Sequence, residues 1–384
     1  MKLSKTAVAV GALALAACSD QSPVSSARAP EAAPLMAASA NGIPGSYVVV
    51  LNEGADPRSV AAVAGVEPNF VYSAAVNGFA ASLNAGQLNA LRHNPNVAYV
   101  EQDQAYQADA TQSGATWGID RIDQRARPLS GTYNYTTTAS TVYAYVIDTG
   151  IYASHSQFGG RASNVYDALG GSGNDCNGHG THVAGTIGSS TYGVAKAARL
   201  RGLRVLDCNG SGATSGIIAA IDWVRVNRTN PAVANLSLGG GYSSTLNTAI
   251  NNLANSGVFV AVAAGNENQN ACNVSPASAA SATTVAASTS TDAKASYSNY
   301  GSCVDLYAPG SSITSTWLNG GTNTISGTSM ASPHVAGVAA LYKATYGNAA
   351  TSTIDSWIKT NSTANVITGN VTGTPNRLLF KSTL

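Results

Sequence analysis

Residues 327–337 read Gly-Thr-Ser-Met-Ala-Ser-Pro-His-Val-Ala-Gly, and this run places a serine at position 329. An aspartate, Asp148, lies far upstream in the run Asp-Thr-Gly, and a histidine, His179, lies between the two in the run His-Gly-Thr-His. A serine hydroxyl is a weak nucleophile unless a base stands beside it. The three stretches can supply a nucleophile, a base and an orienting carboxylate in the chain order Asp, His, Ser. Unrelated folds carry this triad in different orders, so the order helps to choose the fold.

The order Asp, His, Ser is that of the subtilisin class, whereas the chymotrypsin class runs His, Asp, Ser and the α/β-hydrolases run Ser, acid, His. The runs Val146–Gly150, Asn177–Gly185 and 327–337 resemble the three motifs of the subtilisin-like serine peptidases. The resemblance covers about Tyr47–Leu384 and is closest over Thr111–Asn376. It implies a secreted serine endopeptidase that hydrolyses the peptide bonds of proteins through an acyl-enzyme.

Ser329 is the nucleophile that the resemblance implies, and the acyl-enzyme would form on it. The spacing of apolar residues predicts a helix over Met330–Tyr346, so the serine opens a helix whose positive end stabilises negative charge. Taken alone, Ser329 could be an N-cap residue without chemistry. His179 would act first as base and then as acid, and its motif makes His182 structural. A metal-binding histidine pair is disfavoured, because zincins use H-E-x-x-H and these histidines are three residues apart.

Asp148 and Asn266 complete the implied catalytic set. Asp148 stands at the carboxyl end of a predicted strand, where a lone aspartate is usually a turn or cap residue. The run around it favours the catalytic role, in which a carboxylate fixes the imidazole tautomer and stabilises the imidazolium. Asn266 follows Ala-Ala-Gly, and the resemblance makes its amide and the Ser329 N–H the donors to the oxyanion. Its alternative role is that of a turn residue after glycine.

Three glycine-containing runs are the implied substrate contacts, because glycine lets a peptide backbone approach closely. They are Gly210-Ser211-Gly212, Ser237-Leu238-Gly239-Gly240 and Ala263-Ala264-Gly265. The first resembles an edge strand to which substrate adds as a further strand. The other two resemble the walls of the family's S1 pocket. No charged residue lies in these walls, which predicts a broad preference for apolar or aromatic P1 residues.

Calcium in a structural role is the cofactor that the resemblance implies. Asp305 matches the carboxylate of one calcium site, whose other protein ligands are carbonyl oxygens that would fall at Ala280 and Ala282. Calcium accepts such a mixed set of oxygen ligands. The alternative for Asp305 is a solvated surface carboxylate without an ion.

A second calcium site is matched only in part. Its matching residues are Asp120, Asp123 and Gln124. Ser130 and Thr132 stand where some relatives carry Asp and Asn, which puts this site in doubt. Asp175 stands where some relatives bind a further ion, but a second acid is missing from its neighbourhood. Surface carboxylates without an ion are the alternative here as well.

Composition limits the partners. Only 10% of the 384 residues are charged, against about a quarter in an average soluble chain, and the formal net charge is +1, so nucleic acid is not an expected partner. No later stretch has 18 consecutive apolar residues, so no transmembrane helix is expected. The expected partners are protein or peptide substrates and the chain's own pro-domain, acting as an intramolecular inhibitor. The mature form is expected to be a monomer.

The N-terminus predicts export. Lys2 and Lys5 precede the short apolar run Ala7–Ala17, as in a signal peptide over residues 1–18. The run Leu-Ala-Ala-Cys that ends at Cys18 resembles a bacterial lipobox, so a lipid on Cys18 could tether the precursor to the envelope. An ordinary secretory signal is the alternative. Loss of the pro-segment near residue 110 would free an extracellular enzyme.

The remaining chain divides into three predicted parts. Residues 19–45 are rich in Ala, Ser and Pro and predict a disordered linker. Residues 46–109 show the order β-α-β-β-α-β, which is typical of a small ferredoxin-like α+β unit and resembles the inhibitory pro-domain of many subtilisin-like peptidases. Residues 110–384 alternate strands with helices, which predicts an α/β fold with a mainly parallel central sheet and helices on both faces.

Four of the five cysteines remain when Cys18 is set aside, an even number for an exported chain. Sequence alone permits three ways to pair them. The similarity to the proteinase K and aqualysin branch of the family implies the pairs Cys176–Cys208 and Cys272–Cys303.

Two other functions can be compared with the peptidase. An esterase or lipase of the α/β-hydrolase type requires G-x-S-x-G, and Ala331 stands where the last glycine would be. A lipid-anchored binding protein built on an inactivated peptidase fold should lack at least one triad or oxyanion residue, and this chain lacks none. The sequence therefore favours the peptidase.

Overall fold

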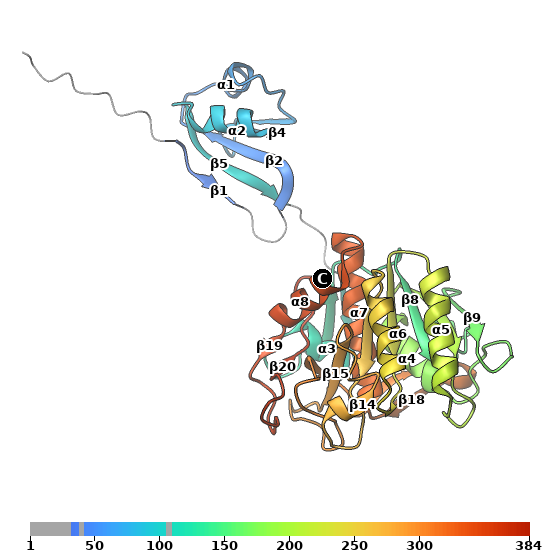
Figure 1. Cartoon of the computed structure of the whole chain (residues 1–384). Helices are drawn as coiled ribbons and strands as arrows, with labels where there is room; N and C mark the ends of the chain where they lie inside the picture. The colour runs from blue at the N-terminus through green and yellow to red at the C-terminus, as the bar shows by residue number, and fades with distance from the viewer. Residues whose placement is uncertain (1–31, 38–41, 105–109) are drawn as a thin grey trace, which may run out of the picture. The chain divides into compact units, whose positions relative to one another are not determined.

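The computed structural model describes residues 32–37, 42–104 and 110–384. The chain divides into two compact units, Met1–Gln107 and Ala108–Leu384, which Figure 1 colours from blue to red along the chain. The predicted signal peptide with Cys18 and most of the predicted linker lie outside the described residues. Within the described ranges, no helix is long and apolar enough to cross a membrane.

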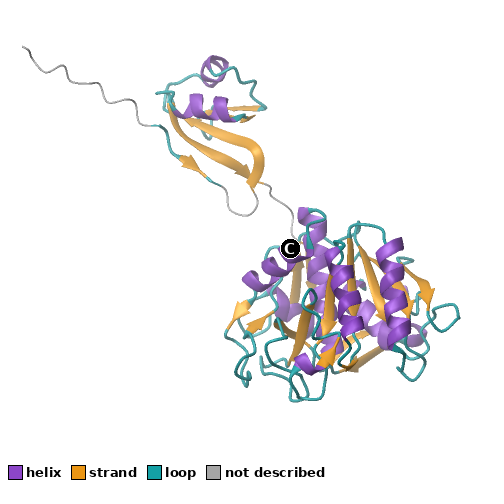
Figure 2. Cartoon of the chain, in the orientation of Figure 1, coloured by secondary structure: helices purple, strands orange, loops and turns teal. Residues whose placement is uncertain are grey.

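The first unit is a five-stranded sheet with two short helices packed against it (Figure 2). Its strands are β1 (Leu35–Met36), β2 (Gly42–Leu51), β3 (Phe70–Tyr72), β4 (Gly78–Ser82) and β5 (Val97–Gln104), and its helices are α1 (Pro57–Val63) and α2 (Ala85–Arg92). The strands lie in the order β1-β5-β2-β4-β3, with β1 parallel to β5 and every other pair antiparallel. From β2 onward the chain follows the predicted order β-α-β-β-α-β.

Capping residues explain where the two helices begin. Asp56 accepts a hydrogen bond from the Ser59 N–H at 2.9 Å. Asn84 and Gln87 form a capping box, in which each side chain accepts a hydrogen bond from the other residue's backbone N–H. These bonds satisfy N–H groups that the first helical turn leaves without a partner.

The structure corrects the predicted linker at residues 19–45, because part of that range belongs to the first unit. β1 pairs with Val100 and Glu101 of β5, and β2 already begins at Gly42. Ala33 is buried, its N–H donates to the Arg92 carbonyl, and Arg92 Nε donates back to the Ala33 carbonyl at 3.0 Å. A composition of Ala, Ser and Pro cannot reveal such pairing, because main-chain hydrogen bonds do not depend on side-chain type.

The second unit is built around a nine-stranded sheet. Across the sheet the strands are β19 (Thr363–Ala364), β20 (Arg377–Leu378), β16 (Leu306–Pro309), β15 (Thr283–Ser288), β13 (Phe259–Ala263), β11 (Ala232–Leu236), β8 (Tyr143–Asp148), β10 (Arg199–Arg204) and β9 (Ala162–Asp167). Only β19 and β20 pair antiparallel; all other neighbours are parallel. The α/β class with a mainly parallel sheet is therefore confirmed.

Helices and small strand pairs surround this sheet (Figure 2). The helices are α3 (Trp117–Asp123), α4 (His179–Gly188), α5 (Thr214–Asn227), α6 (Ser244–Asn255), α7 (Thr328–Tyr346) and α8 (Thr351–Asn361), with short 3-10 turns at Ser156–Phe158, Ala271–Asn273 and Leu318–Gly320. The strand pairs are β6 (Ala110–Ser113) with β7 (Thr132–Tyr135), β12 (Gly240–Gly241) with β14 (Val274–Ser275), and β17 (Ile313–Thr316) with β18 (Thr322–Ile325).

Successive residues of the central strands enter two different cores. In β8, Ala144 and Val146 belong to the core that contains residues of α4 and α7, whereas Tyr145 and Ile147 belong to the core that contains residues of α5 and α6. A sheet that is buried on both faces needs strands that are apolar at every position. This requirement explains the continuous apolar runs in the sequence.

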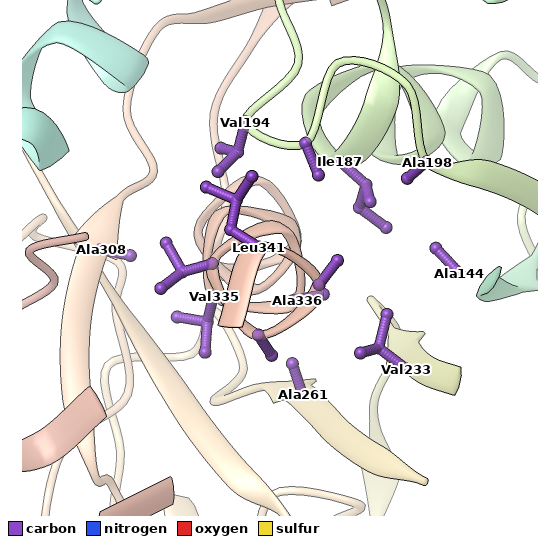
Figure 3. Close-up of a cluster of buried hydrophobic side chains, with 14 of the residues drawn as sticks. Ala144, Ile187, Val194, Ala198, Val233, Ala261, Ala308, Val335, Ala336 and Leu341 are labelled. Carbon is purple, nitrogen blue, oxygen red and sulfur yellow. The ribbon is translucent and has the colours of Figure 1, made fainter. Parts of the chain in front are cut away.

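Helix α7 passes through the core that contains residues of α4, which we call the first core. Every residue of α7 from Met330 to Lys343 is buried. Figure 3 shows this helix among side chains from the strands and from the α4 region; labelled there are Ala144, Ile187, Val194, Ala198, Val233, Ala261, Ala308, Val335, Ala336 and Leu341. Gly337 allows the close approach to Val194, since a Cβ at that position would lie 2.6 Å from the Val194 Cβ.

Shortening a core side chain of α7 should destabilise the second unit. Leu341 is fully buried, so we expect Leu341→Ala to lower the free energy of unfolding by about 2–5 kcal/mol, because it leaves a cavity. All four tryptophans lie in this unit, so tryptophan fluorescence during urea unfolding measures it selectively. Val226→Ala at an exposed position of α5 is the control, with an expected change within about 0.5 kcal/mol. Equal effects of both variants would contradict the assigned core.

Candidate active site

The polar residues singled out from the sequence gather at the carboxyl edge of the parallel sheet, where folds of this class place their ligands. Asp148 is the last residue of β8, Ser237 directly follows β11, and Asn266 follows β13. His179 is the first residue of α4, and Ser329 is the second residue of α7. Strand ends and helix starts thus supply all of these side chains.

Asp148 and His179 form a direct pair. His179 Nδ1 lies 2.8 Å from Asp148 Oδ1, the Asp148 side chain is fully buried, and a quarter of the His179 side chain is exposed. The Asp148 Oδ1 atom also accepts the Thr149 N–H at 2.7 Å. Burial disfavours the charged form of His179, but the charge and hydrogen bond of Asp148, with the charge of Asp175, outweigh it and raise the pKa of His179 above 6.5.

Asp175 organises the loop that leads into α4. Its Oδ1 accepts the Thr149 hydroxyl and the backbone N–H groups of Asn177 and Gly178, each at 2.9 Å. Its Oδ2 accepts the backbone N–H and the hydroxyl of Thr181. Both oxygens of this buried carboxylate therefore accept hydrogen bonds from the protein. This structural role of Asp175 was not predicted, since the sequence suggested only a doubtful ion site there. The turn-forming run Asp-Cys-Asn-Gly before His179 was the available signal.

Ser329 is held against the end of β11. Its Oγ donates to the Ser237 carbonyl at 3.1 Å, and the Ser237 Oγ donates to the Ser329 carbonyl at 2.7 Å. Pro333 has no N–H to offer the Ser329 carbonyl four residues earlier, which leaves that carbonyl free for Ser237. In the described part of the chain, no hydrogen bond joins Ser329 Oγ to His179. Such bonds often tighten only when substrate is bound.

Buried polar side chains support this junction. Asn235 donates to Ser237 Oγ at 2.9 Å, and Ser332 Oγ donates to Asn235 Oδ1 at 2.7 Å. Neither residue was predicted from the sequence, and both are buried. An asparagine inside an otherwise apolar strand was the signal that could have indicated a polar partner.

Asn266 is oriented by the first residue of α7. Its Oδ1 accepts the backbone N–H of Thr328 at 2.9 Å and the Thr328 hydroxyl at 3.0 Å. The Thr328 hydroxyl also accepts the Gly265 N–H at 3.1 Å. Because the carbonyl end of the Asn266 amide is fixed in this way, its NH₂ group is left for another acceptor beside the N-terminus of α7.

Two pockets contain most of the predicted substrate residues. A pocket of about 500 Å³ is lined by His179 together with 210–212 and 237–239. A second pocket of about 320 Å³ is lined by Gly239, Gly240, Ala263 and Gly265. Ala264 is not among the lining residues, because its side chain is buried in a separate hydrophobic cluster.

The structure has no strand at 210–212, the predicted edge strand; Gly210 and Ser211 instead end a turn that begins at Asp207. Asp207 closes it, because its side chain accepts the N–H groups of Asn209 and Ser211 and its backbone N–H donates to the Ser211 carbonyl. Gly210 has a φ of +79°, a left-handed conformation that glycine adopts at little cost. The strong turn-forming side chain of Asp207 explains the difference.

Glu267 lines the smaller pocket together with Gln269 and Asn273. Its Oε2 accepts the side-chain N–H of Asn299 at 2.9 Å. The two predicted wall runs contain no charged residue, but Glu267 adds one to the lining of this pocket. Glu267 lies only two residues beyond the run taken as the wall, and as the one glutamate in 110–384 it was visible in the sequence.

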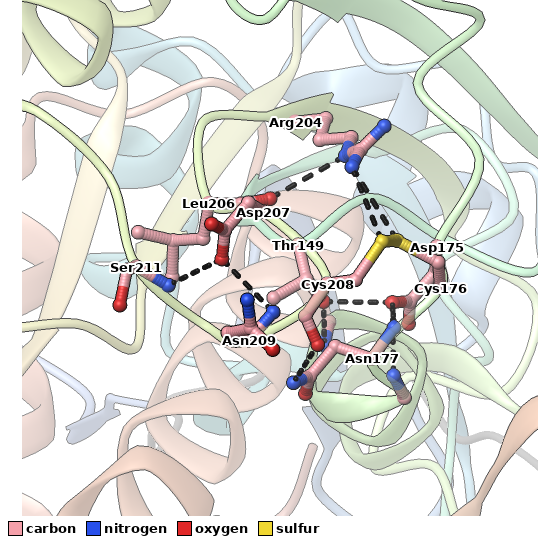
Figure 4. The surroundings of a disulfide bond; sticks show 12 residues. Thr149, Asp175, Cys176, Asn177, Arg204, Leu206, Asp207, Cys208, Asn209 and Ser211 are labelled. Carbon is pink, nitrogen blue, oxygen red and sulfur yellow. Dashed lines mark hydrogen bonds between the residues drawn. A yellow bond between two sulfur atoms is a disulfide. The ribbon is translucent and has the colours of Figure 1, made fainter.

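Two disulfides, Cys176–Cys208 and Cys272–Cys303, are present, and they are the pairs that the resemblance implied. Figure 4 shows the first, which joins the loop before His179 to the turn at 207–211. Asn177 strengthens this link by donating to the Cys208 carbonyl at 3.0 Å. The cross-link therefore ties the histidine loop to the wall of the larger pocket.

At both implied calcium sites, the oxygens that would bind the ion already accept hydrogen bonds or an ion pair from protein groups. Lys359 Nζ lies 2.7 Å from Asp305 Oδ1, so this carboxylate already has a cation. Asp120 accepts the N–H groups of Ser130 and Gly131 and the Ser130 hydroxyl. Asp123 accepts N–H groups of Asn134, and Gln124 Oε1 accepts the Ser130 N–H. No group of three or more His, Cys, Asp or Glu among the described residues could hold a metal.

Comparison with known families decides the identity. Residues 140–378, more than half of the chain, match the family model described as "Subtilase family". The chain belongs to the subtilase family. Residues 62–109 match the model described as "Peptidase inhibitor I9". This subtilase is therefore a serine proteinase, a hydrolase, with an I9 inhibitor domain before its peptidase domain.

Similar proteins support this assignment along the whole chain. The extracellular serine proteinase of Thermus sp. (strain Rt41A) is 50% identical over 97% of each chain. Proteinase R of Parengyodontium album is 44% identical over 92% of each chain. A solved structure of a cold-adapted subtilisin-like serine proteinase is 51% identical with a TM-score of 0.69, covering 70% of this subtilase and 99% of that chain.

The pH dependence of the subtilase should report the raised pKa of His179. Only the neutral imidazole can accept a proton, so kcat/KM for a peptide anilide should rise with pH and reach half its maximum above pH 6.5. Asp175→Asn removes a nearby negative charge and should move this midpoint to lower pH.

Asp222→Asn, at an exposed position of α5, is the matched control and should leave the midpoint unchanged. A shift of equal size in both variants, or a flat profile in the wild type between pH 5 and 8, would contradict the assignment of the base.

Proposed function

We propose that this subtilase is a secreted endopeptidase that cleaves protein peptide bonds through an acyl-enzyme on Ser329. The observation that carries the proposal is the 2.8 Å pair of His179 Nδ1 and Asp148 Oδ1 beside a pocket that His179 and residues 237–239 line together. The pair leaves His179 Nε2 for the serine proton, and Asp148 stabilises the imidazolium that results.

The chemical steps follow from these positions. Ser329 Oγ attacks the scissile carbonyl while His179 Nε2 takes its proton. The Asn266 NH₂ group and the Ser329 backbone N–H donate to the developing oxyanion at the positive end of α7. His179 then gives the proton to the leaving amine, and the C–N bond breaks. A water molecule, deprotonated by His179, hydrolyses the acyl-enzyme and regenerates Ser329.

Secretion is supported by the Thermus relative, which is described as extracellular. We propose the same destination for this subtilase, with residues 1–18 as its signal peptide. Attachment of the precursor to the envelope through Cys18 is a further proposal, and it rests on the lipobox resemblance alone.

Self-maturation is the second part of the proposal. The I9 match ends at residue 109 and the division between the two units falls at Gln107 and Ala108, which supports removal of the pro-segment close to residue 110. The I9 domain would inhibit the enzyme of its own chain until that cut, and the mature form would be a monomer.

Substitution of the nucleophile tests both parts. On one gel the wild type should shorten by about 109 residues and digest casein, because Ser329 performs both reactions. Ser329→Ala should stay full length and inert. Ser326→Ala, a nearby serine whose hydroxyl accepts the Ser312 N–H at a strand pair, is the control and should behave like the wild type. If the wild type also stays whole and leaves casein intact, the proposed cleavage and self-maturation through Ser329 are wrong.

For specificity, we propose a broad preference for apolar and aromatic P1 residues in the pocket of about 320 Å³, whose walls include Gly239, Gly240 and Ala263. The Glu267 carboxylate extends this preference to a P1 lysine, whose ammonium could reach it after the aliphatic stem has passed the apolar walls.

Peptides that differ only at P1 test this preference. Glu267→Gln should lower kcat/KM for a P1 lysine by about 2–5-fold, the size expected of an exposed ion pair, and should leave a P1 phenylalanine unchanged. Equal losses for both peptides would refute the role of Glu267, and a strict requirement for arginine or lysine would refute the apolar preference.

Calcium is bound as a structural ion by subtilases in general. For this chain we propose the C-terminal end of α3, with Asp120, Asp123 and Gln124, as the place where an ion would bind. The ion would have to displace the neutral donors of Ser130, Gly131 and Asn134 whose hydrogen bonds these oxygens accept, whereas at Asp305 it would have to displace an ammonium group. Ser130 and Thr132 stand there in place of an aspartate and an asparagine, so a weak site is expected. Binding at Asp305 is not proposed, because Lys359 occupies that carboxylate.

A further inference from the structure

The Asp305 carboxylate is already satisfied by groups of the protein. Asp305 lies directly before β16, and its N–H donates to the Thr284 carbonyl at 2.9 Å. The Thr284 N–H donates in return to Asp305 Oδ2 at 2.7 Å. Lys359 Nζ lies 2.7 Å from the other oxygen, Oδ1. Each carboxylate oxygen therefore has its own donor.

A second carboxylate holds Lys359 from the side of its own helix. Lys359 Nζ lies 2.7 Å from Asp355 Oδ2, one turn earlier on α8, and Asp355 Oδ1 accepts the Thr283 hydroxyl at 2.8 Å. The ammonium thus bridges two carboxylates that neighbouring threonines of β15 position. It also lies in the last turn of α8, where the helix dipole favours a positive charge.

Packing of α8 against the rest of the second unit fixes the position of Lys359. Ile354 and Ile358 of the same helix are fully buried in the core that contains residues of α4 and α7. Trp357 packs edge-on against Tyr342 of α7 with 5.3 Å between the ring centres. The side chain of Lys359 is only 27% exposed. Its ammonium is therefore a fixed charge at this place and not one position of a mobile surface lysine.

A calcium ion bound to Asp305 Oδ1 would meet the Lys359 ammonium. Ala280 and Ala282, whose carbonyls were the implied ligands, line one pocket of about 360 Å³ together with Asp355 and Lys359. Calcium lies about 2.3–2.6 Å from its oxygen ligands, and the ammonium is at nearly that distance from Asp305 Oδ1 already. Ion and ammonium would compete for one carboxylate and repel each other.

We propose that the ammonium group of Lys359 is the resident cation of the Asp305 site and that this subtilase does not bind calcium there. Lys359 does what a bound ion would do: it neutralises a largely buried carboxylate and joins α8 to the edge formed by β15 and β16. The proposal rests on this ion pair and is independent of the catalytic roles given to other residues.

The thermal unfolding midpoint tests the proposal, measured on the mature enzyme after inhibition with phenylmethylsulfonyl fluoride, in EDTA and in millimolar calcium. Lys359→Gln should lower the midpoint in EDTA by on the order of a few °C, because two carboxylates then face each other without a cation. Calcium should restore part of this loss through the vacated carboxylates. A loss in EDTA supports the proposal even without such restoration.

Lys294→Gln is the matched control, since this ammonium binds the Asn268 amide oxygen and the Ala295 carbonyl and forms no ion pair in the described part of the chain. It should show no restoration by calcium. An unchanged midpoint of Lys359→Gln in EDTA would overturn the proposal. So would a calcium-dependent rise of the wild-type midpoint that Asp305→Asn abolishes.

Metal content provides a measurement that needs no variant of Lys359. Wild type and Asp305→Asn, dialysed against calcium and analysed by atomic emission, should hold the same number of ions, because any bound calcium lies elsewhere, such as the C-terminal end of α3. One ion fewer in Asp305→Asn would show that calcium, and not Lys359, holds the site.

Discussion

The reciprocal pair of hydrogen bonds between Ser237 and Ser329 determines where the start of α7 lies against the sheet. Each residue donates its hydroxyl to the other's carbonyl, and Asn235 and Ser332 connect the same two segments behind them. Hydrogen bonds in such a dry setting are strong, and an unpaired member would be costly. Pro333 is what makes the pairing possible, because it leaves one helical carbonyl without a partner.

A second buried polar group does the same for the histidine. Asp175 gathers five donors from Thr149, from Thr181 and from the loop between them, so the end of β8 and the start of α4 are held by one carboxylate. The two junctions share a design. An apolar sheet supplies a rigid edge, and a few buried polar groups fix the segments that leave it. Loops held in this way can present reactive side chains at a defined place.

Much of this arrangement was predictable from the sequence, because the information is local. The run around Asp148 is an apolar strand that ends in a carboxylate, and the run after Ser329 is a long apolar helix, so the α/β fold could be inferred from the residues. The meeting of Asp148 with His179 was implied only by the resemblance of their motifs to those of subtilisin-like peptidases. The ion pair of Lys359 with Asp305 could not be predicted, since the two residues are distant in the chain and neither lies in a motif that indicates the other. The pairing of β1 was hidden for a different reason, because main-chain hydrogen bonds leave no trace in composition. Glu267 could not be placed from the sequence, because only the fold shows that its side chain turns back to the pocket lined by Gly265.

The disulfide between Cys176 and Cys208 makes the structure of the active-site region depend on the cellular compartment. It joins the loop before His179 to the turn at 207–211. His179 and residues 210–212 line the same larger pocket, so a covalent bond connects two parts of its lining. Such bonds form and persist in oxidising compartments and are rare in the reducing cytosol. The geometry of the larger pocket therefore depends on whether the compartment is oxidising enough to form this disulfide. Under the proposed secretion, this cross-link would form only after export.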